Sequence, residues 1–322
     1  MSKVLFINGQ REEIANIFCA KALPVFDVFW VPYKLDEEEK AVLIRDVDYL
    51  VLHPATISAS LLRKAKSLRL IQLLAAGYDE IDLKLAAELG VPVATNGGAN
   101  SWSVAEHCVA SLLALYKRLP QCDQSVRAGT WRKPVTGFNT FDVAGKTVGI
   151  IGAGNIGRKV ARRFKSFETE ILYCDARPAT DIENVLGVRK VSLEELLAKS
   201  DIITLHVPLL KETRGLIGRH TLPLMKPNAV VINTSRGPVI DEQALVAALE
   251  EGLIAGACLD VFEKEPIASG HPLLKFDNVL LTPHTAGHSY EGWFRRSDFA
   301  WANIQRVAAG QPPLSLAFPE EE

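Results

Sequence analysis

The stretch TVGIIGAGNIG, residues 147–157, decides the expected fold of this chain. Residues 147–151 form a short apolar run typical of a buried strand, and residues 156–167 then follow a helical pattern. The first glycine allows a tight turn, the second lets the backbone approach a phosphate, and the third lets helix and strand pack closely. The stretch therefore predicts a strand, a turn and a helix whose first N–H groups face a phosphate. The expected contacts are Gly152, Gly154, Asn155, Ile156 and Gly157.

An acidic residue, Asp175, ends the next expected strand, about 20 residues after the turn. A carboxylate at this place accepts hydrogen bonds from ribose hydroxyls and repels a 2′-phosphate. The turn and the acid together predict a dinucleotide site that prefers NAD over NADP. Arg177 lies two residues further on, and its positive charge favours the opposite choice.

Short apolar runs alternate with helical patterns along the whole chain, which is typical of parallel sheets joined by crossover helices. The series that contains the glycine turn has strands expected at 147–151, 170–173, 202–206, 229–233, 256–259 and 279–282. An earlier series has strands expected at 4–7, 25–31, 49–52, 70–74 and 91–95. The predicted fold class is α/β, with two doubly wound parallel-sheet domains. One is a Rossmann domain for NAD, and the other is a smaller, flavodoxin-like substrate domain.

The dinucleotide domain is expected to be an insertion. The predicted domains are 103–290 for the cofactor, and 1–102 with 291–322 for the substrate. A helix expected at Asp298–Ala309 would pack back on the N-terminal part, the alternative being that it packs on the cofactor domain. A long helix is expected at Val104–Leu119, with Pro120 as its end.

The composition excludes several classes of protein. The 322 residues carry a net charge of -2, which indicates no attraction to nucleic acid or to an anionic membrane. No apolar run approaches the roughly 20 residues that a membrane-spanning helix needs. The 5 cysteines lack the spacing of a metal site or a disulfide scaffold. We expect reduced thiols, a cytoplasmic location and no metal.

Three loops of the second series carry groups that suit hydride transfer to a 2-oxo acid, because ligands bind at the carboxyl ends of strands in such sheets. Arg236 can hold a carboxylate with two hydrogen bonds. His284 can give a proton to a carbonyl oxygen near neutral pH. Asp260, Glu263 and Glu265 follow one strand, and a carboxylate against the imidazole would orient it and favour its charged form. The residues alone leave the choice between Glu263 and Glu265 open.

Other histidines compete for these roles. His53 ends a strand of the first series and is the rival of His284 as proton donor. His206 ends a strand of the second series and is expected to line the adenine pocket. His107 lies within the long helix and is expected to be structural.

The chain resembles the D-isomer-specific 2-hydroxyacid dehydrogenase family over nearly its whole length. The resemblance is carried by the glycine turn and by the stretches LAAGYD (74–79), VAEH (104–107), HVPL (206–209), NTSRG (233–237), LDVFEKEP (259–266) and TPH (282–284). It implies a catalytic set of Arg236, Glu265 and His284, since Glu265 precedes the proline of the family motif.

The resemblance also implies further contacts. Substrate contacts are expected from Ala76, Gly77, Arg236 and His284. Beyond the turn and Asp175, cofactor contacts are expected from His206, Val207, Thr234, Ser235, Arg236, Asp260, His284, Ala286 and Gly287. Asp260 would reach the nicotinamide carboxamide. Family members are usually dimers that pair partly through the helix after Val104, so a homodimer is expected.

Departures from the family limit the expected substrate. The phosphoglycerate enzymes present an arginine where this chain has His53–Thr56. The phosphite-oxidising members carry a lysine at the place of Ala76, and the formate-oxidising members lack the catalytic glutamate. The leading prediction is an NAD-dependent reductase of glyoxylate or hydroxypyruvate. The alternative is an NAD(H)-sensing binding protein of the corepressor type that shares this fold. Roles for His53, Trp293, Arg295 and Arg296 as pocket-lining groups stay open.

Overall fold

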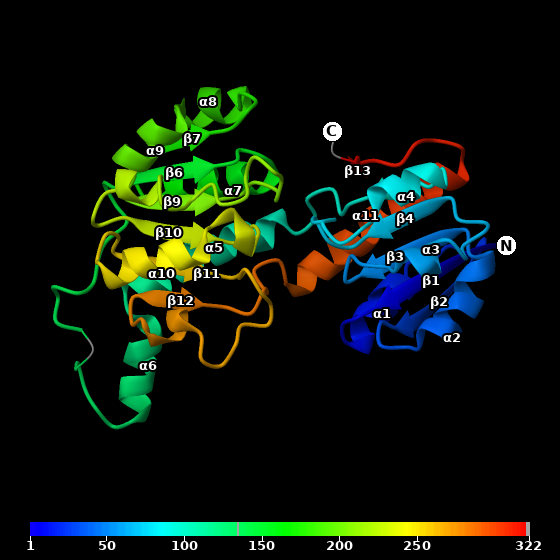
Figure 1. Ribbon diagram of the computed structural model, residues 1–322, viewed down its shortest axis with the longest axis horizontal. Helices are drawn as coiled ribbons and strands as arrows, with labels where there is room; N and C mark the ends of the chain where they lie inside the picture. The colour runs from blue at the N-terminus through cyan, green and yellow to red at the C-terminus, as the bar shows by residue number, and fades with distance from the viewer. Residues whose placement is uncertain (134, 320–322) are drawn as a thin grey trace. The chain divides into compact units, whose positions relative to one another are not determined.

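The computed structural model describes residues 1–133 and 135–319 (Figure 1). Pro134 and the last residues of the predicted substrate domain, 320–322, lie outside the described part. The chain divides into two compact units: unit 1 is Met1–Asn100 with His288–Glu322, and unit 2 is Ser101–Gly287. The boundaries expected from the sequence lie within about three residues of these. Among the described residues, no helix is long and apolar enough to cross a membrane.

Unit 2 contains a seven-stranded sheet in the order β12-β11-β10-β9-β6-β7-β8, with every pair parallel. Its strands are β6 (Thr147–Ile151), β7 (Glu170–Cys174), β8 (Arg189–Lys190), β9 (Ile202–Leu205), β10 (Val230–Asn233), β11 (Gly256–Leu259) and β12 (Val279–Leu281). Numbered within the unit, this is the Rossmann order 3-2-1-4-5-6 with one more strand at the edge. The prediction of a Rossmann sheet is confirmed. The exposed strand β8 was missed because its two basic residues show no apolar pattern.

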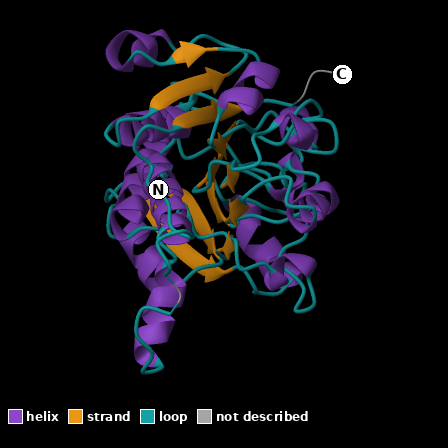
Figure 2. Ribbon diagram, turned by 90° about the vertical axis from the view of Figure 1, so that its left-hand side faces the viewer, coloured by secondary structure: helices purple, strands orange, loops and turns teal. Residues whose placement is uncertain are grey.

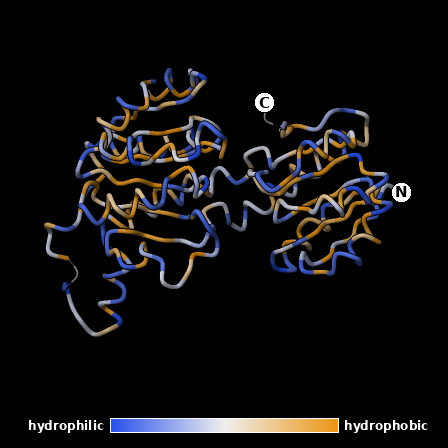
Figure 3. The backbone as a smooth tube through the Cα atoms, viewed as in Figure 1, coloured by the Kyte–Doolittle hydropathy of each residue, from blue (hydrophilic) through white to orange (hydrophobic). Residues whose placement is uncertain are grey.

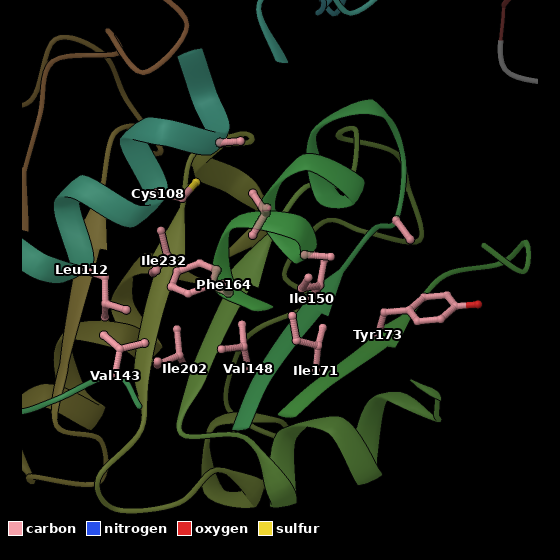
Figure 4. Packing of buried hydrophobic residues seen from close by; sticks show 14 of the residues in the cluster. Cys108, Leu112, Val143, Val148, Ile150, Phe164, Ile171, Tyr173, Ile202 and Ile232 are labelled. Carbon is pink, nitrogen blue, oxygen red and sulfur yellow. The ribbon is translucent and has the colours of Figure 1, made fainter. Parts of the chain in front are cut away.

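Helices cover both faces of this sheet (Figure 2). They are α5 (Ser101–Tyr116), α6 (Leu119–Arg127), α7 (Asn155–Lys165), α8 (Thr180–Leu186), α9 (Leu193–Lys199) and α10 (Glu242–Glu250), with short 3₁₀ helices η2 (Leu222–Leu224), η3 (Gly237–Val239) and η4 (Pro272–Lys275). Alternate strand residues enter opposite cores, Val148 and Ile150 on the face of α5 and α7, and Ile151 on the face of α9 and α10. Figure 4 shows Phe164 of α7 at the centre of the first core, with Cys108 and Leu112 of α5 beside it.

The predicted end of the long helix was wrong. Helix α5 ends at Tyr116, and Arg118 takes a left-handed φ of 51°. Pro120 does not end this helix but lies in the first turn of α6, where its missing N–H costs no hydrogen bond.

Unit 1 contains a six-stranded sheet in the order β13-β5-β4-β3-β1-β2. Its strands are β1 (Ser2–Asn8), β2 (Phe26–Pro32), β3 (Tyr49–His53), β4 (Leu70–Leu73), β5 (Val93–Ala94) and β13 (Leu316–Ala317). The first five are parallel in the flavodoxin-like order 2-1-3-4-5, which confirms the predicted fold class. Strand β13 is antiparallel to β5 and was not expected. Figure 3 shows the hydrophobic residues concentrated along the strands of both sheets.

The helices of unit 1 also lie on two faces. They are α1 (Glu12–Cys19), α2 (Glu37–Leu43), α3 (Ala59–Leu62), α4 (Leu83–Glu88) and α11 (Tyr290–Ala308), with η1 (Ile44–Asp46). Helix α11 packs against α1 and β4, where Trp301 stacks on Phe18. It begins at Tyr290 rather than at the expected Asp298, and Ser289 caps it by accepting from the Gly292 N–H. This first part of the helix was not predicted, because the polar run Arg295–Asp298 interrupts the apolar spacing that indicates a helix.

Candidate active site

The glycine turn after β6 has the shape that a pyrophosphate needs. Gly152 has a φ of +94°, and a Cβ atom there would lie 2.6 Å from the carbonyl oxygen of His206. A Cβ atom on Gly157 would lie 2.0 Å from the carbonyl oxygen of Gly152. By contrast, a Cβ atom on Gly154 would meet nothing within 4 Å. The first and third glycines are therefore required by packing, while the second leaves open space above the backbone.

The start of helix α7 fits an anion in that space. Gly154 is its N-cap, and no described side chain caps it with a hydrogen bond. The uncapped N–H groups and the helix dipole favour negative charge at this end. The residues present therefore fit the phosphates of a dinucleotide.

Asp175 follows β7 and is tied to the turn. Its Oδ2 accepts a hydrogen bond from the Ala153 N–H at 2.7 Å, and its Oδ1 accepts one from the Arg177 N–H at 2.9 Å. A carboxylate has about four acceptor sites, so both oxygens keep capacity for ribose hydroxyls. The carboxylate thus stands beside the turn in a fixed orientation.

His206 and Val207 follow β9, which pairs with β6 at the point where the strand order reverses. Ligands of open α/β sheets bind in the crevice at such a point. The His206 ring is held by a contact of 2.9 Å between Nε2 and Thr204 Oγ1, and its Nδ1 is buried with no partner in the described part of the chain. Burial lowers the pKa of His206 to about 3, so the ring is neutral.

The loop after β10 is organised by the buried side chain of Asn233. Its Oδ1 accepts from the N–H and hydroxyl of Ser235 at 3.0 and 2.8 Å, and its Nδ2 donates to the Arg236 carbonyl at 2.9 Å. These contacts present the half-buried Arg236 side chain, whose Nη1 donates to the Ser235 carbonyl at 2.7 Å. Thr234 Oγ1 lies 3.4 Å from Cys108 Sγ. This role of Asn233 was not predicted, although an asparagine side chain often accepts from the backbone N–H two residues further on in such turns.

Gly237 joins the Arg236 loop to the loop after β11. A Cβ atom on Gly237 would lie 1.9 Å from the carbonyl oxygen of Phe262 and 2.5 Å from the Glu263 nitrogen. Only glycine allows this approach of two backbones. The contact was also missed, because nothing in the sequence connects two segments so far apart.

The structure brings Glu265, and not Glu263, to His284. His284 Nδ1 lies 2.7 Å from Glu265 Oε2, while Glu265 Oε1 accepts from the Phe262 N–H at 3.0 Å. The Glu263 N–H instead donates to Glu242 Oε2 at 3.1 Å. Because the carboxylate accepts at Nδ1, that nitrogen carries a proton and Nε2 is left for exchange with a substrate.

Glu265 is held in its ionised form. Burial alone raises its pKa, but the hydrogen bonds from His284 and the Phe262 N–H, with the charges of His284 and Arg236, lower the pKa below its usual value. The carboxylate therefore persists down to a lower pH than an ordinary glutamate would allow.

Asp260 is 2% exposed and braces the loop that carries His284. Its two carboxylate oxygens accept hydrogen bonds from Thr282 Oγ1 and from the N–H groups of Thr285 and Ala286. Gly287 follows as the last residue of unit 2. His107, expected to be structural, contacts this group through Thr282.

Unit 1 holds the remaining predicted residues. Ala76 is exposed and Gly77 half-buried in the loop after β4, and this loop is held by the Asn96 N–H, which donates to the Ala75 carbonyl at 3.0 Å. His53, at the end of β3, is 9% exposed and packs edge-on against Trp293, with 5.1 Å between ring centroids.

Two arginines of α11 lie close to this aromatic pair. Arg296 lies over the Trp293 ring at 4.4 Å, and its burial, with a smaller effect of the neighbouring Arg295, lowers its pKa to about 10. Arg295 Nε donates to the Ala99 carbonyl at 3.1 Å. Arg296 and Trp293 are thus buried side chains of the helix, and His53 is packed against Trp293.

Among the described residues, no group of three or more His, Cys, Asp or Glu side chains is placed to hold a metal ion. The chemistry of the unit 2 loops is that of a proton donor supported by a carboxylate, next to a cation and a dinucleotide turn. Groups of these kinds suit hydride transfer to or from a carbonyl compound.

Comparison with known proteins identifies the family. The profile of the "D-isomer specific 2-hydroxyacid dehydrogenase, NAD binding domain" matches residues 109–286. The chain is 41% identical over 298 residues to glyoxylate reductase of Thermofilum pendens, covering 90% of this chain and 86% of that protein. It is 43% identical over 281 residues to glyoxylate reductase of Korarchaeum cryptofilum, covering 86% and 84%.

A solved structure agrees with this result. The NADPH-dependent glyoxylate/hydroxypyruvate reductase of Sinorhizobium meliloti superposes with a TM-score of 0.85 at 28% identity, covering 99% of this chain and 100% of that one. The chain belongs to the D-isomer-specific 2-hydroxyacid dehydrogenase family. It is an oxidoreductase with an NAD(P)-binding domain.

We predict that Gly237→Ala lowers turnover of a 2-oxo acid about 100-fold, the cost of displacing a catalytic group by about 1 Å. The added methyl group would push the Phe262 backbone, and with it Glu265, away from His284. Steady-state kinetics with glyoxylate would measure the effect. Gly270→Ala is the matched control, because a Cβ atom there meets nothing within 4 Å. Equal activity of the two variants would contradict the proposed role of the close contact.

Proposed function

We propose that the chain reduces glyoxylate or hydroxypyruvate to the corresponding D-2-hydroxy acid with NADH. The observation that carries this proposal is the 2.7 Å pair between His284 Nδ1 and Glu265 Oε2, at the carboxyl edge of the sheet that holds the dinucleotide turn. The similarity to two glyoxylate reductases supports the substrate class. The stretch His53–Thr56 at the end of β3 lacks the arginine of the phosphoglycerate enzymes, which argues against a phosphorylated substrate.

The three proposed catalytic residues have different roles in this reaction. A nicotinamide cofactor, when bound, would supply the hydride. His284, protonated at both nitrogens, donates its Nε2 proton to the substrate oxygen, while Glu265 stabilises the imidazolium and holds its orientation. Arg236 binds the substrate carboxylate and polarises the carbonyl oxygen. The backbone N–H groups of Ala76 and Gly77 would bind the same carboxylate.

His284→Ala should lower kcat for glyoxylate reduction by about 10²- to 10⁴-fold, the usual contribution of a general acid. Binding of NADH should persist, because the turn and Asp175 are untouched. Steady-state kinetics and NADH fluorescence titration measure the two quantities. His220→Ala, an exposed histidine of the same unit, is the control. Wild-type turnover in His284→Ala would rule out this residue as the proton donor.

The preference for NAD over NADP rests on Asp175. Its fixed carboxylate stands where ribose hydroxyls would bind, and its charge opposes a 2′-phosphate. The Sinorhizobium meliloti enzyme is described as NADPH-dependent, so the fold also accepts the phosphorylated cofactor. The other proposed cofactor contacts are Gly152, Gly154, Asn155, Ile156, Gly157, His206, Val207, Thr234, Ser235, Arg236, Asp260, His284, Ala286 and Gly287.

A panel of 2-oxo acids assayed with NADH and with NADPH tests substrate and cofactor together. We expect glyoxylate and hydroxypyruvate to give the highest kcat/KM, and NADH to exceed NADPH at least tenfold, about the 1.4 kcal/mol of one charged hydrogen bond. In Asp175→Asn, the amide oxygen can still accept the hydrogen bond from the Ala153 N–H, but the negative charge is lost. The variant should therefore have a lower ratio of kcat/KM with NADH to kcat/KM with NADPH. A preference for NADPH would contradict the role of Asp175. No activity on any panel member would favour the NAD(H)-sensing alternative.

We also propose that the chain is a cytoplasmic homodimer. Helix α6 has no buried residue, and Figure 1 shows it extending away from the strands of unit 2. Together with the following loop it exposes five large hydrophobic residues at 50–94%: Leu119, Val126, Trp131, Phe138 and Phe141. An apolar surface of this kind usually pairs with a partner, here a second copy of the chain. The 5 cysteines are all unpaired, which suits a reducing compartment.

Phe138→Asp combined with Trp131→Asp should convert the dimer to a monomer, because two charges would enter the apolar contact. Light scattering coupled to size-exclusion chromatography measures the mass directly. Val185→Asp is the control, since Val185 is a 74% exposed hydrophobic residue on α8 of the same unit. The proposal fails if the wild-type chain is monomeric or the double variant stays dimeric.

A further inference from the structure

The loop that carries His284 depends on one buried carboxylate. The N–H groups of Thr285 and Ala286 donate to Asp260 Oδ1 and Oδ2 at 2.9 and 2.8 Å. The His284 N–H donates to the Asp260 carbonyl at 2.8 Å. His284 has a φ of 54°, a left-handed conformation that residues other than glycine adopt uncommonly. These hydrogen bonds hold this backbone conformation in place.

The Thr282 hydroxyl connects this carboxylate to helix α5. Thr282 Oγ1 lies 2.6 Å from Asp260 Oδ1 and 3.1 Å from His107 Nε2. Each Asp260 oxygen already accepts a backbone N–H, so the carboxylate acts as an acceptor and Thr282 gives it its one proton. Thr282 Oγ1 must then accept from His107, whose Nε2 carries a proton. The hydrogen bonds run in one direction, from His107 through Thr282 to Asp260.

The surroundings of His107 agree with this arrangement. Its side chain is 23% exposed, and Nε2 lies 3.9 Å from Asp260 Oδ1. Burial lowers the pKa of His107, while the charge of Asp260 opposes that effect. A leucine would fill a similar volume, but it could not donate to Thr282. Packing at this position could be satisfied by an apolar side chain, so the histidine is needed only for the hydrogen bond that it donates to Thr282.

We propose that His107 is a positioning residue for the reaction, which orients Asp260 through Thr282 and thereby fixes the loop that presents His284. It acts through two other side chains and gives no proton to the substrate. The inference rests on the proposed role of His284 as proton donor. It assigns a function to a helix residue that sequence reasoning treats as structural.

Variants of the two donors test the inference. His107→Leu should lower kcat for glyoxylate reduction with NADH about 10- to 100-fold, as expected for a misplaced catalytic group, without changing the melting temperature. His107→Gln, whose amide can donate to Thr282, should restore most of this loss. Thr282→Val should match His107→Leu, and Thr282→Ser should resemble the wild type. The double variant His107→Leu/Thr282→Val should lose no more than either single one, because the two residues act in one chain.

Two further variants separate the possible failures. His220→Leu makes the same substitution at an exposed histidine of unit 2 and should leave turnover unchanged. Wild-type turnover in His107→Leu, while His284→Ala is inactive, overturns this inference alone. Wild-type turnover in His284→Ala overturns the proposed function itself. Equal loss in His107→Leu and His107→Gln, or additive losses in the double variant, would mean that His107 only packs, and would also overturn the inference.

Discussion

The parallel pairing of the strands in unit 2 is the constraint on which the candidate site depends. Strand β10 pairs with both β9 and β11, and β11 in turn pairs with β12, all in the same direction. Every carboxyl end in this series therefore reaches the same edge of the sheet. The loops that leave this edge carry the glycine turn, Arg236, Glu265 and His284. Residues separated by more than a hundred positions in the chain are brought together by backbone hydrogen bonds.

Within that edge, the loops are shaped by close backbone contacts and buried hydrogen bonds rather than by apolar packing. Gly237 lies against the Phe262 backbone, and Asn233 satisfies three groups of its own loop. Asp260 holds the left-handed backbone at His284. A conformation of this kind persists only where the surroundings compensate for its cost, and it is typical of functional sites. The two apolar cores below the loops supply a rigid support for them.

The two units contribute different chemistry. Unit 2 carries the dinucleotide turn, the carboxylate–imidazole pair and the arginine, which are sufficient to define an oxidoreductase. Unit 1 carries a loop of small residues at Ala76 and Gly77 and a buried group of Trp293, His53 and Arg296. In the proposed reaction, Arg236 and His284 would contact groups that all 2-oxo acids share, so these two residues do not distinguish one such acid from another.

The sequence alone was sufficient for the class of fold and the Rossmann turn, and it singled out Arg236 and His284 as candidates, because these depend on local patterns. A strand that runs into a glycine-rich turn has one common structural outcome, and polar residues after apolar strands point to the ligand-binding edge. Choosing Glu265 over Glu263 from the residues needed the tertiary structure, since two carboxylates two positions apart differ only in where their side chains point. The start of α11, the strand β13 and the contact of Gly237 with Phe262 likewise depend on distant segments. The contact of His107 with Thr282 depends on the packing of α5 against the sheet, which no local pattern records.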